Sequence, residues 1–287
     1  MKPKNVSVVS WGGLGDALLA TPGFRAMKER WPELRLTVYC KSWLHYELYL
    51  HNPHIDSLRG PGIVSRARQT LAKALRIPLI EPNYGSLHPS LIYSKSASEI
   101  IAEMFGLELK QKDLVISLTH DEEESAKRIL EHYQIPVAIH VGADFSPNKH
   151  WPVQSWEALV LRNPRYTFLQ IGRPSDQKVT GTVDLRGKTS LRCSLAVVKY
   201  AKSFVGVDSV FAHATNAFGT PGVVLFGPSS PVIWGHPNNC NLFLSLRCAP
   251  CIDILGEHPC PYSTQCLKGI VVEAVEQSLN QQLRQQV

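Results

Sequence analysis

The chain has 287 residues, of which 44% are hydrophobic and 19% are charged, enough for one large or two ordinary packed domains. This composition excludes wholesale disorder. No run of 18 apolar residues occurs, and the short polar N-terminus does not resemble a signal peptide, so we expect a cytoplasmic protein without a membrane-spanning segment. The net charge of +6 comes from dispersed basic residues, which favours a small anionic ligand and argues against nucleic acid as a partner.

Strand-like and helix-like segments alternate along the chain, which is typical of an α/β protein with a mainly parallel sheet. A buried strand is predicted at 6–10, followed by a glycine turn and a helical stretch at 17–30. Pro22 and Gly23 should bend or restart that helix. In the first part of the chain we also expect strands at 34–40 and 113–118 and helices at 66–76, 96–107 and 121–133.

A second α/β series begins at Val137, and we place the domain boundary in the preceding break, which contains Pro136. The predicted domains are therefore 1–134 and 135–287, the second with a cysteine-rich segment at 248–266 and a C-terminal helix. Within it we expect strands at 137–141, 166–171, 203–206 and 222–226, and helices at 153–161, 190–201, 209–218 and 268–284.

The first candidate site is the turn Trp11-Gly12-Gly13-Leu14-Gly15-Asp16, directly after the first strand. Its glycines allow a tight turn and a close approach of a ligand to the backbone. A dinucleotide fingerprint would need a further glycine where Leu18 stands, which argues against a nicotinamide-dependent oxidoreductase. Asp16 lies where strand ends open onto a crevice in such folds, so it is a candidate functional carboxylate. A plain capping role for Asp16 is the alternative.

The second candidate site is the loop after strand 137–141, where Gly142 and Ala143 are followed by Lys149 and a helix start. Loop amides and a lysine cation together suit a phosphate group. The loop lacks the G-x-x-x-x-G-K spacing of a Walker loop. The alternative is a solvated lysine on a surface loop.

The third candidate site lies after strand 203–206, where Asp208 and Ser209 precede a helix and His213 stands one turn into it. A histidine there can reach back to an anion held at the helix N-terminus. The alternatives are ordinary helix caps for Asp208 and Ser209 and a buried structural histidine.

Four cysteines follow near the end of the chain, Cys248, Cys251, Cys260 and Cys266. A C-x-x-C pair with two further thiols can hold zinc or iron tetrahedrally, as a structural ion. The second pair lacks the C-x-x-C spacing of a zinc ribbon, so reduced thiols packed in a loop-rich segment are the alternative.

Together these motifs resemble the family 9 glycosyltransferases, the ADP-heptose:lipopolysaccharide heptosyltransferases and their relatives. The matching segments cover most of the chain: residues 12–22, 149–152, 206–209 with His213, 219–228, and Cys266-Leu267. The resemblance implies a GT-B architecture, in which two Rossmann-like domains with parallel sheets face each other across a cleft. The acceptor would bind mainly to the N-terminal domain and the nucleotide sugar mainly to the C-terminal domain.

The resemblance also implies roles for individual residues. Asp16 falls on the catalytic carboxylate and Lys149 on the lysine that binds the donor phosphates, while Asp208, Ser209 and His213 fall on the donor-binding helix start. Backbone at four further positions would line the ligand: Gly13, Gly15, Gly142 and Ala143. We place the adenosine near Gly172, in the loop 170–176.

The implied activity is an inverting transfer of a sugar, heptose from ADP-heptose, to a hydroxyl of a glycan, a protein or a small molecule. No D-x-D sequence occurs, so we expect no cofactor to be required for catalysis. The expected location is the cytoplasm, with peripheral association at the inner face of the inner membrane. A non-catalytic nucleotide-sugar-binding or scaffold protein of the same fold is the alternative function.

Overall fold

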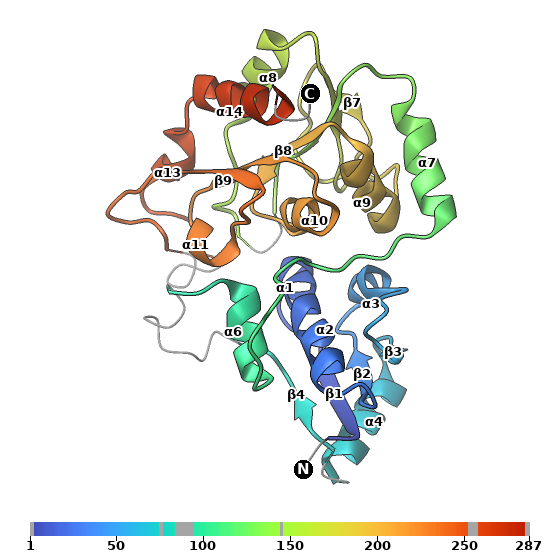
Figure 1. The fold of residues 1–287 in the computed structure, drawn as a ribbon. Coiled ribbons are helices and arrows are strands. Elements are labelled where there is room, and N and C mark those ends of the chain that lie inside the picture. The colour runs from blue at the N-terminus through green and yellow to red at the C-terminus, as the bar shows by residue number, and fades with distance from the viewer. Residues whose placement is uncertain (1–2, 75–76, 84–93, 144–145, 252–257, 285–287) are drawn as a thin grey trace. The chain divides into compact units, whose positions relative to one another are not determined.

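The computed structural model describes residues 3–74, 77–83, 94–143, 146–251 and 258–284. The chain divides into two compact units, Met1–Thr119 and His120–Val287. Each unit is built on one sheet whose described strands all pair in parallel (Figure 1). Two α/β units with parallel sheets agree with the fold class expected from the sequence.

The first unit has a four-stranded sheet in the order β3-β2-β1-β4. Its strands are β1 (Asn5–Val9), β2 (Arg35–Tyr39), β3 (Ser57–Arg59) and β4 (Leu79–Ile80). The chain adds strands outward from β1 to β3 and then returns to the other side of β1 with β4. The order of the strands therefore reverses between β1 and β4.

Five helices of the first unit are described: α1 (Leu14–Leu19), α2 (Thr21–Arg30), α3 (Trp43–Tyr49), α4 (Ile63–Ala74) and α6 (Ala97–Met104). The restart expected near Pro22 is confirmed, because α1 ends and α2 begins around Ala20. Pro22 stands in the first turn of α2, where its missing N–H breaks no helical hydrogen bond. Phe24 stacks on Phe105 with ring centroids 6.1 Å apart, and a Cβ on Gly23 would lie 2.7 Å from the Phe105 ring.

The expected strand at 113–118 is wrong, since these residues form no strand in the structure. Side chains of α2 take up backbone groups that a neighbouring strand would have paired. Arg25 Nη2 donates to the carbonyls of Gln111 (2.9 Å) and Asp113 (3.0 Å), and Thr21 Oγ1 accepts from the Val115 N–H (2.9 Å). In the segment 41–90 the sequence predicted one basic helix, which forms as α4, but it did not predict α3, β3 or β4.

The second unit has a six-stranded sheet in the order β10-β9-β8-β5-β6-β7. Its strands are β5 (Pro136–His140), β6 (Thr167–Gln170), β7 (Val183–Asp184), β8 (Ser203–Val207), β9 (Gly222–Phe226) and β10 (Asn239–Phe243). Here the chain runs from β5 outward to β7 and then returns to the other side of β5 with β8. All residues of β5, β8 and β9 are buried, as expected for central parallel strands.

The described helices of the second unit are α7 (His120–Leu130), α8 (Val153–Arg162), α9 (Leu191–Tyr200), α10 (Val210–Phe218), α11 (Pro231–Trp234), α13 (Gln265–Lys268) and α14 (Val272–Arg284). The single helix expected at 268–284 is thus two helices, with Gly269 ending the first. Val275 and Leu279 of α14 join the core formed by β5, β8 and β9. Among the described residues, no helix has both the length and the apolar character needed to cross a membrane.

Helix α7 belongs to the second unit, so the division lies at Thr119 rather than at the expected residue 134. The acidic first turn of α7 packs against basic residues of α9. Arg192 donates to both carboxylate oxygens of Glu122, with a distance of 2.8 Å from Nη2 to Oε2, and Lys199 pairs with Glu123. The Arg192 side chain is only 5% exposed.

Replacing Arg192 with Met should therefore lower the free energy of unfolding by about 2–3 kcal/mol, because a half-buried carboxylate loses two charge-assisted hydrogen bonds. Denaturant unfolding of the whole chain measures this change. Arg162→Met is the matched control, since Arg162 pairs with Glu273 and Glu276 but is 44% exposed, and should cost less than about 1 kcal/mol. Equal losses in the two variants would contradict the assignment of α7 to the second unit's core.

Candidate functional site

The reversals of strand order locate two candidate sites, one in each unit. In open parallel sheets the loops at the carboxyl ends of the two strands beside a reversal lead away to opposite faces, which leaves a crevice for ligands. In the first unit this position is the end of β1, where the turn with Asp16 begins. In the second unit it is the end of β5 and β8, which lead to Lys149 and Asp208.

The Asp16 turn, residues 10–16, has its carboxylate folded back over its own glycines. Asp16 Oδ2 accepts a hydrogen bond from the Gly13 N–H at 2.7 Å. Gly12 has φ +67°, and a Cβ there would lie 2.2 Å from the same oxygen, so only glycine fits. Gly13 is the N-cap of α1 and Gly15 lies in its first turn. The capping role considered for Asp16 is therefore present, and it fixes the position of a half-buried carboxylate.

Lys41 and His45 also lie at this turn, although the sequence analysis did not single them out. Lys41 Nζ donates to the Gly12 carbonyl at 3.0 Å. His45 is buried, and its Nδ1 lies 2.8 Å from Ser42 Oγ. Burial, and then the charge of Lys41, lower the pKa of His45. Within the described part of the chain its buried Nε2 makes no hydrogen bond. Both residues belong to a segment without a recognisable motif, so no sequence signal pointed to them.

In the second unit Lys149 and Asp208 form a buried ion pair. Lys149 Nζ lies 2.6 Å from Asp208 Oδ2, and the two side chains are 13% and 4% exposed. Burial alone would raise the pKa of Asp208, but the charge of Lys149, with smaller contributions from His213 and from hydrogen bonds, outweighs it and holds the pKa below its usual value. Lys149 is therefore not the solvated surface lysine considered as the alternative, because it is paired with a carboxylate that follows the neighbouring strand. It is the more exposed of the two paired side chains.

Two buried histidines lie behind this ion pair. His213 Nε2 is 3.6 Å from Asp208 Oδ1, and His213 Nδ1 is 2.9 Å from His236 Nε2. Burial lowers the pKa of His213 to about 4 and that of His236 to about 3. Both rings are therefore neutral at pH 7. A proton on His213 Nε2, facing the carboxylate, leaves Nδ1 to accept from His236. His236 follows α11 in a segment without a recognisable motif, so it could not be identified as a site residue from the sequence.

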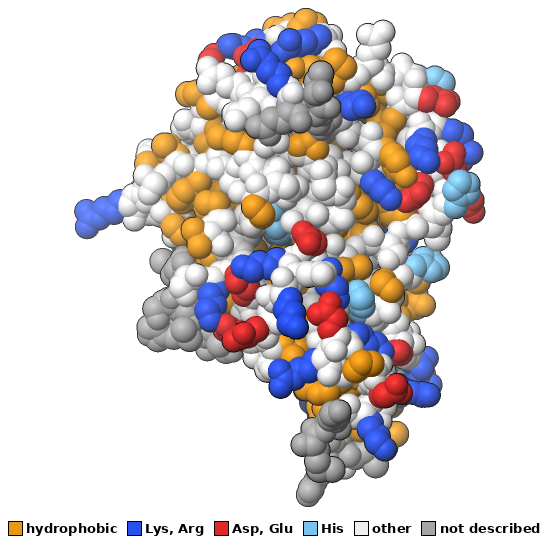
Figure 2. Space-filling model, in the orientation of Figure 1, with side chains coloured by type: hydrophobic (Ala, Val, Ile, Leu, Met, Phe, Trp, Pro, Cys, Tyr) orange, Lys and Arg blue, Asp and Glu red, His pale blue; other side chains and the backbone are white. Residues whose placement is uncertain are grey.

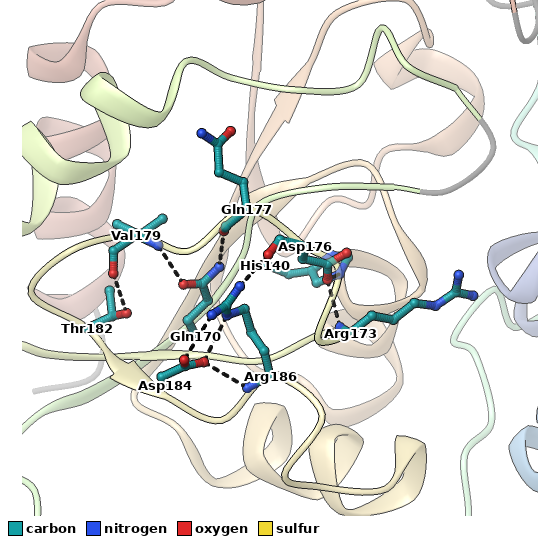
Figure 3. A network of polar contacts seen from close by, with 9 residues as sticks. All are labelled: His140, Gln170, Arg173, Asp176, Gln177, Val179, Thr182, Asp184 and Arg186. Carbon is teal, nitrogen blue, oxygen red and sulfur yellow. Dashed lines mark hydrogen bonds and ion pairs between the residues drawn. The ribbon is translucent and has the colours of Figure 1, made fainter.

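Ser209 belongs to a second polar chain, the His140 network, of which Figure 3 shows the part from His140 to Asp176 and Arg173. Its hydroxyl makes no capping bond to α10 and lies 3.0 Å from His140 Nδ1 instead. His140 Nε2 lies 3.6 Å from Asp176 Oδ2, which also accepts from the Arg173 N–H at 2.8 Å. Burial works to raise the pKa of Asp176, but the hydrogen bonds from His140 and Arg173 outweigh it and lower it. His140 and Asp176 were not predicted as site residues.

The loop that carries Asp176 is fixed from both sides, as Figure 3 shows. The buried amide of Gln170 donates to the Gln177 carbonyl (2.7 Å) and accepts from the Val179 N–H (2.9 Å). Gly172 has φ +132°, and a Cβ there would lie 2.2 Å from Asp176 Oδ2. The carboxylate of Asp176 thus occupies the space that Gly172 leaves beside it. The adenosine position expected near Gly172 stays a prediction.

The loop that carries Lys149 is docked on the C-terminal part of the unit. Asn148 donates to the His258 carbonyl and accepts from the Cys260 N–H, both at 2.8 Å, and Trp151 Nε1 donates to the Ile270 carbonyl at 2.9 Å. Gly142, at the start of this loop, is buried, and a Cβ there would lie 3.0 Å from the His150 ring. Ala143 is half-buried, and the two residues after it are not among those described.

None of the four cysteines expected to bind a metal forms a disulfide in this structure. Cys266 is buried and Cys248, Cys251 and Cys260 are half-buried. Burial raises the pKa of Cys266, and the nearby Cys260 and Cys248 contribute to the rise. Among the residues that the structure describes, no group of three or more His, Cys, Asp or Glu side chains is placed to hold a metal ion. The metal site expected from the sequence stays a prediction.

The face of the molecule drawn in Figure 2 carries charged side chains of both signs. Figure 2 shows Lys and Arg side chains interspersed with Asp and Glu over the face drawn, without a broad basic stripe. A nucleic-acid binder needs clustered basic residues on one face.

The two buried histidines should make the stability of the protein depend on pH. The unfolded chain takes up protons on both rings below about pH 6.5, whereas the folded chain does not until pH falls to about 4, so stability should fall as pH decreases across this range. His236→Gln should reduce this slope by about 1.4 kcal/mol per pH unit. The lowered pKa of Asp208 affects stability only at lower pH. Denaturant unfolding at a series of pH values measures the slope.

The matched control is His132→Gln, which removes a histidine that is 73% exposed in the same unit. Its pH slope should equal that of the unaltered chain. An unchanged slope in His236→Gln would mean that this ring is protonated in the folded protein.

Comparison with known proteins supplies the family. The model of glycosyltransferase family 9 (heptosyltransferase) matches residues 93–258, more than half of the chain. Lipopolysaccharide heptosyltransferase 2 of Salmonella typhimurium is 23% identical over 287 aligned residues, which cover 77% of this chain and 82% of that protein.

Two solved structures share the fold. The iron-containing dodecameric glycosyltransferase TibC of enterotoxigenic E. coli superposes with a TM-score of 0.77 at 18% identity, over 100% of this chain and 78% of TibC. The ADP-heptose LPS heptosyltransferase II of E. coli superposes with a TM-score of 0.73 at 17% identity, over 98% of this chain and 99% of that one. The GT-B class of two parallel-sheet α/β domains, expected from the sequence, is confirmed. The chain belongs to glycosyltransferase family 9 and is a glycosyltransferase of the heptosyltransferase type.

Proposed function

We propose that this enzyme transfers a heptose from ADP-heptose to an acceptor hydroxyl with inversion at the anomeric carbon. The observation that carries the proposal is the Lys149–Asp208 pair at the strand reversal of the second unit. The ammonium group of this pair is a fixed cation that a diphosphate can contact. The donor is inferred from relatives: TibC has been crystallised in complex with ADP-D-β-D-heptose, and E. coli heptosyltransferase WaaC with ADP.

In the proposed reaction Lys149 binds the diphosphate of the donor. As the bond between the anomeric carbon and the phosphate oxygen breaks, negative charge grows on the leaving ADP, and a fixed ammonium group stabilises it. The Ser209 hydroxyl and the amides near Gly142 and Ala143 are the further donors proposed. None of these steps uses a metal ion, in keeping with the missing D-x-D sequence.

Asp208 and His213 act mainly by holding Lys149. Both are almost fully buried, at 4% and 2% exposed, and His213 is neutral at pH 7 because of its low pKa. The histidine thus contributes a hydrogen bond rather than a charge. Asp208 prevents the ammonium group from turning toward water when no donor is bound. Adenosine is proposed to lie by the loop after β6, near Gly172.

Asp16 is the proposed general base. It accepts the proton of the acceptor hydroxyl while that oxygen attacks the anomeric carbon from the face opposite the leaving ADP, which inverts the configuration. The Asp16 turn holds the carboxylate at the end of β1, with Lys41 and His45 beside it. The proposed acceptor is a hydroxyl of a glycan, since the Salmonella relative is named as a lipopolysaccharide heptosyltransferase. A non-catalytic role is not favoured, because the matched relatives are transferases.

A panel of nucleotide sugars tests the donor. Thermal unfolding of the full chain is followed with ADP-heptose and with GDP-, UDP- and TDP-sugars at equal concentrations. ADP-heptose should raise the unfolding temperature most, because a ligand that binds only the folded state stabilises it. A larger shift with another nucleotide would replace ADP in the proposal.

Replacing Asp16 with Asn should reduce kcat by roughly 10²–10⁴-fold and leave the affinity for the donor nearly unchanged. The amide keeps an oxygen that can accept from the Gly13 N–H, so the turn is preserved while the base is lost. Steady-state transfer kinetics and calorimetric donor binding give the two quantities. Asp113→Asn, at an exposed position of the same unit, is the control and should keep full activity. Full activity in Asp16→Asn would overturn the assignment of the base.

Replacing Lys149 with Gln should weaken ADP binding by roughly 10–100-fold, the loss of a charge-assisted hydrogen bond of about 1.5–3 kcal/mol. Titration calorimetry with ADP measures this, and Lys268→Gln, at an exposed lysine of the same unit, is the control. The single variant also leaves Asp208 as a buried unpaired anion. The double variant Lys149→Gln/Asp208→Asn removes that anion, so it should regain stability but not ADP affinity. Restored ADP affinity in the double variant would exclude a phosphate contact by Lys149.

A further inference from the structure

Helix α4 of the first unit carries its apolar side chains on the outside. Ile63, Val64 and Leu71 are 84%, 66% and 56% exposed, whereas the polar residues Ser65 and Gln69 are only half-exposed. Ser65 Oγ donates to the Gly60 carbonyl, which holds this polar face toward the protein. A surface helix of a globular protein normally shows the opposite arrangement, with its apolar face on the core.

The exposed apolar residues form one continuous stripe with basic flanks. At 100° per residue, Ile63, Val64, Leu71 and the alanines 67 and 74 fall within an arc of roughly 100°. Arg68 lies on one side of this arc, and Arg66 and Lys73 lie on the other. All three basic residues are exposed, and the sequence of α4 contains no Asp or Glu.

An exposed tryptophan extends the apolar surface beyond α4. Trp43, the first residue of α3, is 63% exposed, and its neighbour Leu44 is 38% exposed. The Trp43 ring lies against Gly60, since a Cβ on that glycine would be 2.6 Å from Cζ3 of the ring. Gly60 precedes α4 and is the residue to which Ser65 is bonded. Trp43 therefore adds exposed apolar surface beside the segment that leads into α4.

We propose that this face, formed by the exposed residues of α4 with Trp43 beside its N-terminal end, docks onto an anionic lipid surface. An apolar stripe flanked by Arg and Lys is the pattern by which helices lie in the headgroup region of a bilayer, with basic side chains against lipid phosphates. Tryptophan is enriched at the same depth. The inference does not depend on the donor or acceptor proposed above.

A second copy of the chain fits this face less well. A two-fold symmetric contact would bring the stripe onto itself and place Arg66, Arg68 and Lys73 opposite the same basic residues. Like charges facing each other destabilise such a contact, and no acid on α4 compensates them. Lipid phosphates supply the missing negative charge.

Co-sedimentation of the full chain with lipid vesicles tests the proposal. The chain should bind vesicles of equal parts phosphatidylglycerol and phosphatidylcholine and bind phosphatidylcholine alone at least about tenfold more weakly, with binding that falls as salt rises. Ile63→Ser/Leu71→Ser should reduce binding about tenfold or more through lost apolar contact. Arg66→Glu/Arg68→Glu should remove the preference for the anionic lipid.

The matched control is Leu161→Ser/Val271→Ser, which removes two apolar side chains of the second unit that are 81% and 56% exposed. It should bind vesicles as the unaltered chain does. The proposal is overturned if the chain does not bind anionic vesicles, or if Leu161→Ser/Val271→Ser loses as much binding as Ile63→Ser/Leu71→Ser. It is also overturned if light scattering shows a dimer that Ile63→Ser/Leu71→Ser dissociates. ADP affinity should be unchanged in all these variants, so a failed donor proposal is detected separately.

Discussion

The reversal of strand order in each parallel sheet is the constraint on which the candidate sites depend. Parallel strands end at the same edge, so loops that are far apart in sequence meet there, and a reversal keeps the next connection from covering them. In the second unit this brings together the loops after β5 and β8, which carry Lys149 and Asp208. In the first unit the same rule exposes the turn after β1. The topology of each sheet thus locates its candidate site before any single side chain is considered.

Burial then determines which groups can carry charge. Asp208 is almost completely removed from water, so it requires a cation, and Lys149 supplies one at 2.6 Å. The histidines behind it respond in the opposite way: with no further carboxylate facing them among the described contacts, they lose their charge, and their pKa values fall to about 4 and about 3. This buried cluster therefore contains one charged pair and two neutral rings. This arrangement holds a cation in place without adding net charge in the core.

Much of the fold and of the candidate sites could be predicted from the sequence, because short motifs mark positions where the backbone requires particular residues. Glycines that need positive φ, such as Gly12, and residues at helix starts, such as Asp208 and Ser209, are visible as local patterns. The sequence analysis missed His45, His140 and His236 as site residues because their roles arise only from contacts with distant residues. The strand expected at 113–118 failed for a related reason: backbone groups in and beside this segment are bonded to side chains of α2 rather than to a neighbouring strand.

The position of α7 bears on how this family can be recombined. The helix precedes β5 in sequence, yet its acids are the partners of Arg192 and Lys199 on α9. A chimera joined at the break near Pro136 would take α7 from one parent and α9 from the other. Arg192 and Lys199 would then face an α7 that did not evolve with them. Crossovers placed before His120 take both helices from a single parent and exchange the whole second unit.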